Sequence, residues 1–412
     1  MRFGGNCDIL IAGGDFVETI MTECREKEEK LIALRRRLHT VPEIGGELPK
    51  TKKIVCDFLS EIGVDYTENE GDDGIIAEIR GDREGKTIAF RADMDALHIN
   101  EENDFSYRSQ IEGQMHGCGH DAHTAILLIA AEILNKRRAN LCGRVRLLFQ
   151  TGEETGTGAK VMIENGALDG TDAVFALHVG NIAGDEHKSG DFIILPGPVS
   201  AGKNKFTIKI YGKGTHAAFP EKGIDPILVG AKIIAACEGI TKRELPEGSA
   251  AVLNFGSFNA GKDHNTIPAT AELRGGIRVQ DEELRERLGE KLVALSEDIA
   301  SAVGARCAVD IKRGSKTVMN DKDLSRMAAD AVAKAVGTDR VKTETGSPLM
   351  GSDDFANYAS RVPSVYFFLH TNNEQKGITE TNHNPRFDVD EAVLWEGVAA
   401  YVAIAEQFLN DI

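Results

Sequence analysis

The sequence is short of basic residues. It has 48 Lys and Arg against 65 Asp and Glu, which gives a formal net charge of −17. Nucleic acids and anionic membranes are bound through clustered Lys and Arg that release counterions. We therefore expect neither a nucleic acid nor a membrane as a partner. The net charge does not exclude a small anionic substrate, because such a ligand responds only to the field at its own site.

Long apolar runs and paired cysteines are also missing. No stretch approaches the roughly 20 apolar residues of a membrane-spanning helix, and the apolar residues 8–12 are too few for a secretion signal. The seven cysteines are an odd number and include no pair of Cys-x-x-Cys motifs, which argues against a disulfide framework and against a zinc finger. We expect a protein of the reducing cytoplasm.

Internal repeats and low-complexity tracts are absent, and 412 residues are too many for one ordinary core. Strand-like and helix-like segments alternate in both terminal parts of the chain. The expected helices cover two segments within 23–62, then 124–135, 324–336 and 390–409, and the expected strands cover 74–80, 87–91, 145–150, 173–178 and 364–370. This alternation predicts an α/β fold with a mostly parallel sheet flanked by helices. In such sheets, chemistry gathers beyond the carboxyl ends of the strands.

The middle of the chain has a different order of elements, which follows a hinge-like segment at 195–202. The pattern predicts strand, helix, two strands, helix and strand at 206–211, 226–240, 251–258, 270–279, 282–302 and 308–312. This β-α-β-β-α-β order is that of a ferredoxin-like α+β unit. We therefore expect a catalytic metal-binding domain made of residues 1–198 and 313–412, with an inserted domain of residues 199–312.

The segment His116–His123, with the sequence HGCGHDAH, concentrates groups that bind metal. Three His, one Cys and one Asp lie within eight residues. Thiolate and imidazole both coordinate ions such as zinc, manganese and cobalt, and the glycines allow a tight turn around an ion. The alternative is a loop whose histidines only begin a helix. We favour the metal site because such groupings are what metal sites require.

Further candidates lie at the ends of predicted strands and in a late loop. Glu153 and Glu154 follow the strand that ends at Gln150, and His178 ends the next strand. Adjacent acids are often a solvated turn, but beside a metal one can bind the ion while the other moves a proton. A buried His is costly unless its nitrogens are paired or ligated. His383 lies in a polar loop and would be a surface residue unless it joins the same site.

Ordered motifs along the chain resemble those of a known superfamily. They are Arg35–Glu43, Phe90–Leu97, Met115–His123, Glu153–Glu154, Ala176–Val179, Gly212–Ala217, Asn265–Pro268, Gly351–Phe355 and His383–Asp388. The chain resembles the dinuclear metallopeptidases that include zinc aminoacylases and carboxypeptidases. It is most similar to the amidohydrolase branch of hippurate hydrolases, N-acyl-amino-acid deacylases and auxin-conjugate hydrolases. The resemblance implies a phosphorylase/aminopeptidase-like catalytic domain with an inserted ferredoxin-like dimerisation, or lid, domain.

The resemblance also implies a site for two divalent ions, with zinc, manganese, cobalt and nickel as candidates. The implied ligands are Cys118, His120, Glu154, His178 and His383, with Cys118 between the two ions. Glu153 is implied as the general base, and Asp95 as the acid that orients the metal centre from behind the ligands. Asp93 stands where other branches have a metal-binding His. Asp121 and His123 are then not ligands, and we expect them to support the ligands or to begin a helix.

The resemblance also assigns roles to three residues of the inserted domain. His216 is implied to reach the active site of a neighbouring subunit and to donate a hydrogen bond to the developing oxyanion, which requires at least a homodimer. Asn265 and Arg278 are implied to hold the substrate carboxylate, which a guanidinium can bind through two hydrogen bonds. Spacing alone would make each of them a turn residue or a member of a surface ion pair.

The chain departs from the usual residues of the branch at a few motif positions, namely His98, residues 151–152, Glu221 and Asn384. None of these is a proposed ligand. We expect them to border the substrate pocket and to affect which acyl group and amino acid it accepts. Residues 1–22 lie outside the resemblance.

The expected activity is hydrolysis of an N-acyl amino acid to a carboxylic acid and a free amino acid by metal-activated water. A dipeptidase or carboxypeptidase is the nearest alternative. A metal-binding scaffold without activity would require a broken ligand set or a missing base, and the sequence has neither. A thiol hydrolase with Cys118 as its nucleophile would keep its activity in chelator.

Overall fold

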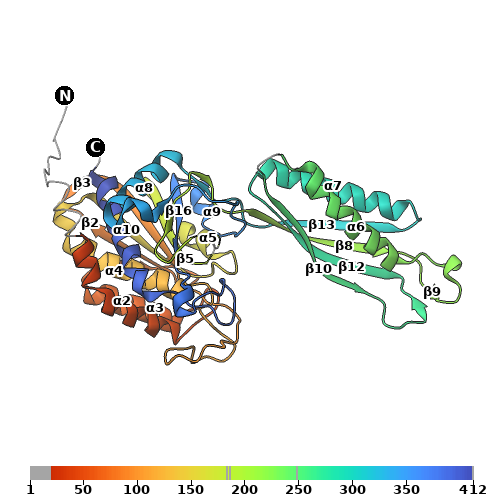
Figure 1. Ribbon diagram of the computed structural model, residues 1–412, viewed down its shortest axis with the longest axis horizontal. Coiled ribbons are helices and arrows are strands. Elements are labelled where there is room, and N and C mark those ends of the chain that lie inside the picture. Colours follow the sequence, from red (N-terminus) through yellow and green to blue (C-terminus); the bar gives the residue numbers. More distant parts are fainter. Residues whose placement is uncertain (1–19, 182–183, 185–186, 247–248, 411–412) are drawn as a thin grey trace. The chain divides into compact units, whose positions relative to one another are not determined.

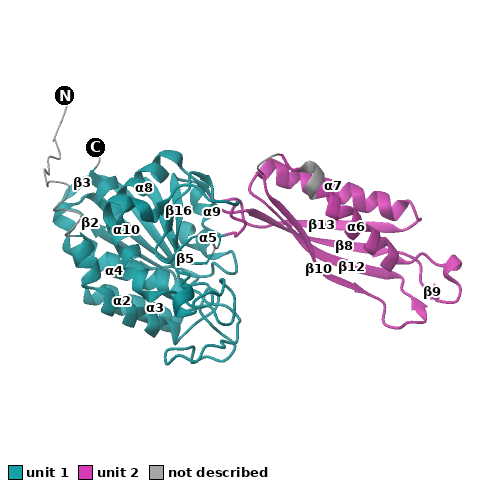
Figure 2. Cartoon of the chain, viewed as in Figure 1, with its two compact units in different colours: residues 1–199, 319–347, 353–412 teal, residues 200–318, 348–352 magenta. Residues whose placement is uncertain are grey.

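The computed structural model describes residues 20–181, 184, 187–246 and 249–410, and the chain forms two compact units (Figure 2). Unit 1 contains Met1–Val199, Met319–Ser347 and Asp353–Ile412, and unit 2 contains Ser200–Val318 and Pro348–Ser352. The insert was expected at 199–312, so unit 2 continues six residues further and gains a second short segment.

Hydrogen bonds explain why unit 2 includes these additional residues. The backbone N–H of Lys203 donates to Ser315 O at 3.0 Å, and that of Gly202 donates to Thr317 Oγ1 at 3.0 Å. The N–H of Ala201 donates to Gly351 O at 2.7 Å. Both segments are therefore held to the first strand of the insert.

Unit 1 is built on an eight-stranded sheet (Figure 1). In sheet order the strands are β1 (Asp65–Glu68), β2 (Ile75–Arg80), β4 (Cys142–Gln150), β3 (Arg83–Asp93), β5 (Ala173–Gly180), β16 (Ser364–His370), β6 (Phe192–Ile193) and β15 (Val341–Lys342). The four central strands β4, β3, β5 and β16 are parallel. Every residue of β5 and β16 is buried, as expected for strands covered on both faces, and this explains their continuous apolar sequences.

Helices pack around these central strands. They are α2 (Glu28–His39), α3 (Pro49–Glu61), α4 (His120–Lys136), α5 (Gly158–Glu164), α8 (Lys322–Val336), α9 (Ala356–Ala359) and α10 (Leu394–Asn410). Helices α4 and α10 contact each other and β3, while α2 packs on α4 and α8 packs on α10. Short 3-10 helices cover Arg138–Asn140, Pro220–Lys222, Thr338–Arg340, Glu374–Lys376 and Glu391–Val393.

One described segment corrects an expectation about apolar runs. Glu391–Asn410 has a mean hydropathy of 1.3 and is long and apolar enough to cross a membrane by length and composition. The expectation that no stretch approaches that length was therefore wrong here. Because 78% of the apolar window is buried inside the protein, this segment is a core helix.

Unit 2 is the expected ferredoxin-like unit. Its elements are β8 (Gly202–Tyr211), α6 (Pro226–Glu244), β10 (Ala251–Ala260), β12 (Thr270–Val279), α7 (Glu282–Ser301) and β13 (Arg306–Arg313). The sheet order is β10-β12-β8-β13, and all its pairs are antiparallel. Alternate residues such as Phe206, Ile208 and Leu273 are buried in one cluster with apolar residues of α6 and α7, so both helices lie on one face of this sheet (Figure 1).

Two pairs of two-residue strands complete the structure. β9 (Thr215–His216) pairs with β11 (Thr266–Ile267) within unit 2. β7 (Gly197–Pro198) pairs with β14 (Met319–Asn320), where the chain leaves unit 1 and where it returns. The second pair closes the insertion at its base.

Candidate metal centre

The candidate metal centre lies at the carboxyl edge of the parallel strands of unit 1. β3 ends at Asp93, β4 ends three residues before Glu153, and β5 contains His178. The loop before α4 contributes Cys118, and α4 begins with His120. Parallel strands bring their carboxyl ends to the same edge of a sheet, so these residues meet although they are distant in sequence.

The five expected ligands form two groups that share Cys118. The ligand atoms of Cys118, His120 and His178 lie within 4.8 Å of one another, and so do those of Cys118, Glu154 and His383. The Sγ atom of Cys118 lies 3.5 Å from Nε2 of His178. Two ligand groups with a common thiolate are an arrangement suited to two ions.

Backbone contacts determine which nitrogen of each buried histidine faces the site. Nδ1 of His120 lies 2.7 Å from Asp95 O, and Nδ1 of His178 lies 2.9 Å from Val179 O. A carbonyl oxygen only accepts, so in the neutral ring each Nδ1 carries the proton and each Nε2 presents a lone pair. Nε2 of His120 is buried without a hydrogen-bond partner. A buried polar atom of this kind requires a partner, and a cation supplies one.

His123 was not expected as a ligand, although Asp93, His120 and His123 form a further group whose ligand atoms lie within 4.8 Å of one another. Its Nδ1 lies 2.5 Å from Asp93 Oδ1, and its Nε2 accepts a hydrogen bond from the backbone N–H of Val179 at 2.8 Å. Both ring nitrogens are thus occupied within the protein.

Asp95 holds the two adjacent acids in place. Its carboxylate accepts hydrogen bonds from the backbone N–H groups of Glu153, at 3.0 Å, and Glu154, at 3.2 Å. Asp95 is buried, and burial raises the pKa of its carboxyl. These two hydrogen bonds fix the backbone of the turn after β4. Glu154 then joins a candidate ligand group, and Glu153 lies beside it.

His383 completes the second ligand group from a loop after β16. Its Nε2 lies 3.3 Å from Oε1 of Glu154, and its backbone has the left-handed φ of 71°. The nearby Cys118 and Glu154 raise the pKa of His383 to about 10. Cys118 and Glu154, which favour a proton on His383, would also favour a metal cation there. Such a cation would replace the proton on the imidazole.

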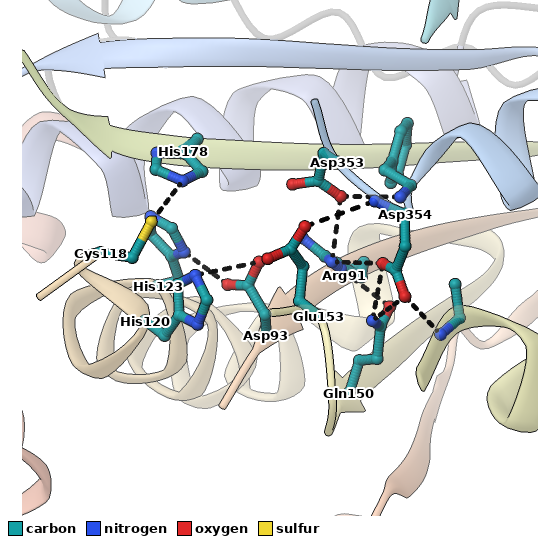
Figure 3. Close-up of polar contacts among 12 residues, drawn as sticks. Arg91, Asp93, Cys118, His120, His123, Gln150, Glu153, His178, Asp353 and Asp354 are labelled. Carbon is teal, nitrogen blue, oxygen red and sulfur yellow. Dashed lines mark hydrogen bonds and ion pairs between the residues drawn. The ribbon is translucent and has the colours of Figure 1, made fainter. Parts of the chain in front are cut away.

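A buried network behind Glu153 was not assigned from the sequence (Figure 3). Arg91 is buried; its Nη1 donates to Asp93, and its Nη2 donates to Asp353 at 3.2 Å and to Asp354 at 3.0 Å. The backbone N–H of Asp354 in turn donates to Glu153 Oε1 at 3.4 Å. Arg91 and the two later acids lie in motifs noted in the sequence, but nothing in their spacing indicated this contact.

This network affects the protonation of the candidate base. Burial and the carboxylates of Asp353 and Asp354 raise the pKa of Glu153 well above its usual range. Burial also raises the pKa of Asp354 to about 7, although the Arg91 guanidinium opposes this shift. A carboxylate whose pKa is raised toward neutrality is better suited to accept and return a proton.

A second buried network supports the start of α4 from the other side. Arg35 Nε donates to Asp121 Oδ2 at 2.8 Å, and His39 Nδ1 lies 2.8 Å from the same oxygen. Arg35 and His39 therefore hold Oδ2 of Asp121, while Oδ1 is buried without a hydrogen-bond partner. His116 is also buried, and burial lowers the pKa of its imidazole to about 3, so it remains neutral.

The candidate residues of the inserted domain lie in unit 2. His216 is exposed on β9, and the backbone N–H of Ala217 beside it donates to Asn265 O at 2.9 Å. His216 and Asn265 are therefore neighbours. Arg278 lies on β12, where its Nη1 donates to Met350 O and Ser352 Oγ, each at 3.3 Å.

Comparisons with known proteins identify the family. Residues 89–407 match the sequence pattern of peptidase family M20/M25/M40. Thermostable carboxypeptidase 1 of Saccharolobus solfataricus is 36% identical over 400 residues, which cover 96% of this chain and 100% of that protein. N-acetylcysteine deacetylase of Bacillus subtilis is 36% identical over 390 residues, or 93% of this chain and 98% of that protein.

Solved structures show the same similarity. A protein from methicillin-resistant Staphylococcus aureus has a TM-score of 0.86 and 32% identity, covering 95% of this chain and 99% of that one. A Bacillus subtilis dinuclear metal binding peptidase from the M20 family has a TM-score of 0.80 and 31% identity, covering 94% of this chain and 100% of that one.

The fold and the paired ligand groups define a metal-dependent hydrolase that acts on amide bonds and has a site for two divalent ions. The chain belongs to peptidase family M20/M25/M40.

Proposed function

We propose that the protein hydrolyses N-acyl amino acids, with acetyl or benzoyl as typical acyl groups, to a carboxylic acid and a free amino acid. The observation that carries this proposal is the pair of ligand groups sharing Cys118, with Glu153 beside them. We assign Cys118, His120, Glu154, His178 and His383 as ligands of zinc, manganese, cobalt or nickel. Two such ions would polarise the amide carbonyl and lower the pKa of a water molecule.

Glu153 is the proposed general base. It takes a proton from the attacking water as the oxygen adds to the amide carbon, and it delivers that proton to the leaving nitrogen as the C–N bond breaks. The raised pKa of Glu153 and its position beside the ligand atoms of His120 and Glu154 support this role. Asp95 positions both acids through their backbone N–H groups.

His216 is the proposed donor to the oxyanion. The backbone N–H of Ala218 donates to its Nδ1 at 3.1 Å, so in the neutral ring the proton is on Nε2. The side chain is exposed, and Nε2–H can donate to a charge that develops on the substrate oxygen. The neighbouring Asn265, together with Arg278, is proposed to hold the substrate carboxylate.

A homodimer is part of this proposal because His216 is expected to act on the partner subunit's site. β10 is an edge strand of its sheet, with Val252 and Phe258 exposed on it. Phe219 and Leu228 of unit 2 are also exposed apolar residues. An open strand edge and exposed apolar side chains are surfaces that proteins usually cover.

A carboxypeptidase is the second candidate, because a carboxypeptidase is 36% identical over 96% of the chain. The two activities cleave the same kind of bond next to a carboxylate-bearing residue. A panel of N-acetyl-amino acids, N-benzoyl-amino acids, free dipeptides and blocked peptides separates them. We expect kcat/KM to be at least about tenfold higher for the N-acyl amino acids. The reverse order would favour the peptidase.

We also propose that the protein is cytoplasmic. Its described cysteines are all free thiols: Cys24, Cys56, Cys118, Cys142, Cys237 and Cys307. Free thiols, including one among the proposed ligands, suit a reducing compartment. His98, Glu221 and Asn384 remain the proposed positions through which this chain differs from its relatives in substrate choice.

A further inference from the structure

The sheet of unit 2 has one face without helices, which we call the open face. Buried residues such as Phe206 and Ile208 face α6 and α7, so the alternate residues of β8, β12 and β13 face the other way. The cations on this face are Lys203, Lys205, Lys209, Arg274, Arg278, Arg306 and Lys312. Only two acids, Glu272 and Asp310, share it on these strands. An excess of cations is unexpected in a protein with a net charge of −17.

Two of these lysines face each other across strands. Lys205 of β8 is the register partner of Lys312 of β13, and Lys209 lies four residues further along β8. Like charges directly opposite each other destabilise a sheet. In the part of the chain that the structure describes, none of these three lysines forms an ion pair. An anion between them would remove the repulsion.

The lysines line a depression of about 660 Å³. Arg274 and Glu272 also line it, but they form an ion pair with each other at 2.7 Å. Lys205, Lys209 and Lys312 also line it, with Glu272 as the cross-strand partner of Lys209 and Asp310 as the remaining acid. The volume lies within the range of small-molecule sites.

The basic surface is bounded, which indicates the size of the ligand. The neighbouring edge strand β10 carries no Lys or Arg, and its Val252 is exposed. Where β8 ends and β13 begins, the Arg306 guanidinium lies 3.9 Å from the ring centroid of Tyr211. A nucleic acid needs a longer basic track with exposed aromatic rings for its bases. The bounded surface favours a small ligand instead.

We propose that the open face, centred on Lys205 and Lys312, binds a small multivalent oxyanion of the phosphate or sulfate class. Compact ammonium groups suit such an anion because each acts as a point charge that can approach any of its oxygens. Lys209 supplies a third positive charge to the same depression. Arg278 of the same face is proposed to hold the substrate carboxylate, but it does not line this depression, and none of the three lysines is assigned a part in the proposed hydrolysis.

The test measures binding of a trisulfonated pyrene dye by fluorescence anisotropy to the full-length, metal-loaded protein. The variants are the double substitution Lys205→Ala/Lys312→Ala and the control Lys232→Ala, which removes an exposed lysine from α6. We expect the double variant to bind the dye at least about tenfold more weakly and the control to bind it as the wild type does. Inorganic sulfate and phosphate should displace the dye, and added sodium chloride should weaken its binding.

If the double variant bound the dye as tightly as the wild type, the proposal would be overturned. The same result, with the same consequence, is expected if the dye binds at the metal centre. Equal weakening in the Lys232→Ala control would also overturn it, since the effect would then be general charge. Stronger displacement by poly-glutamate or single-stranded RNA than by phosphate, at equal charge concentration, would assign the face to a polymer instead. Circular dichroism of the double variant must match the wild type, and the single variants Lys205→Ala and Lys312→Ala repeat the test if it does not.

Discussion

At the scale of single residues, Cys118 occupies the position common to both ligand groups. Its Sγ faces Nε2 of His178 on one side, and Asn382 Nδ2 donates to its backbone carbonyl at 3.1 Å on the other. A thiolate has enough lone pairs to contact two cations at once. We therefore expect the loss of this one side chain to affect both ions.

Metal content tests this expectation. Cys118→Ala should reduce bound metal from two ions per chain to less than one, whereas His383→Ala should remove mainly one, because Glu154 and His383 belong to a single group. The measurement is mass spectrometry of metals after dialysis. Cys56→Ala, at a half-buried thiol outside the site, is the matched control. Retention of two ions by Cys118→Ala would contradict the bridging role.

Residue types predicted a metal site at 116–123, and the resemblance supplied the full set of candidate ligands. They did not indicate the role of Arg91. Its partners Asp353 and Asp354 lie about 260 positions later in the chain, and two acids before a short helix are ordinary in sequence. Only the fold brings the guanidinium and the carboxylates together, so this network could not be derived from local pattern.

At the scale of elements, the long helices and strands were predictable and the two-residue strands were not. The continuous apolar runs of β5 and β16 and the long apolar segment of α10 each leave a pattern in the sequence. Strands such as β6 and β15 have two residues each, too few for any period to appear. The start of α4 was also missed, because its first turn is made of polar site residues and precedes the apolar run expected at 124–135.

Gly119 connects the ligand loop to α4, and its replacement should be costly. Its φ is 88°, and a Cβ there would lie 2.6 Å from Val179 Cγ2. The control is Gly63→Ala, where φ is 70° and nothing lies within 4 Å. Both changes add backbone strain, but only Gly119→Ala adds overpacking, so it should lower the free energy of unfolding by about 1–3 kcal/mol more. Urea unfolding measures the difference, and equal losses would contradict the close contact.

The contact between α2 and α4 includes a charge cluster with a defined pH dependence. Glu132 accepts from Lys27 Nζ at 2.6 Å, from Lys136 Nζ at 2.9 Å and from Lys30 Nζ at 3.0 Å. Burial alone would raise the pKa of Glu132, but these lysines lower it from 4.5 to about 2. A lowered carboxyl pKa stabilises the fold above pH 4.5, and the contribution is lost as the pH falls toward 2.

Glu132→Gln should therefore lower the free energy of unfolding at pH 7 by about 1–2 kcal/mol, after allowance for solvent screening. The difference from the wild type should shrink at pH 3. Urea unfolding in chelator, which removes the contribution of bound metal, measures both values. Glu61→Gln is the control, because Glu61 forms only an exposed pair with Lys30 at 3.4 Å. A difference that grows with acidity would contradict the assigned direction.

At the scale of the whole molecule, the chain divides its candidate residues between two units. The proposed ligands, Asp95 and Glu153 belong to unit 1, whereas His216, Asn265 and Arg278 belong to unit 2. The order of elements predicted the inserted unit, but not the final segment that returns to it, because residues 348–352 form no helix or strand.

Mixed dimers test whether the two units act across a subunit boundary. Glu153→Ala and His216→Ala chains should each be inactive, but coexpression should restore about a quarter of wild-type activity, because half of the dimers then contain one intact composite site. The measurement compares specific activity of coexpressed chains with that of the separately purified chains combined on ice. No recovery on coexpression would place His216 and Glu153 of the same chain in one site.

The central claim is that two divalent ions and Glu153 together hydrolyse the amide bond of an N-acyl amino acid. The most direct measurement follows release of free amino acid from N-acetyl-amino acids by wild-type and Glu153→Gln protein, before chelation, after chelation and after metal is restored. We expect wild-type activity to disappear with chelator and return with metal, and Glu153→Gln to retain two bound ions while losing at least about 1000-fold in kcat. Activity that persists in chelator, or a metal-loaded Glu153→Gln protein with wild-type kcat, would contradict the account.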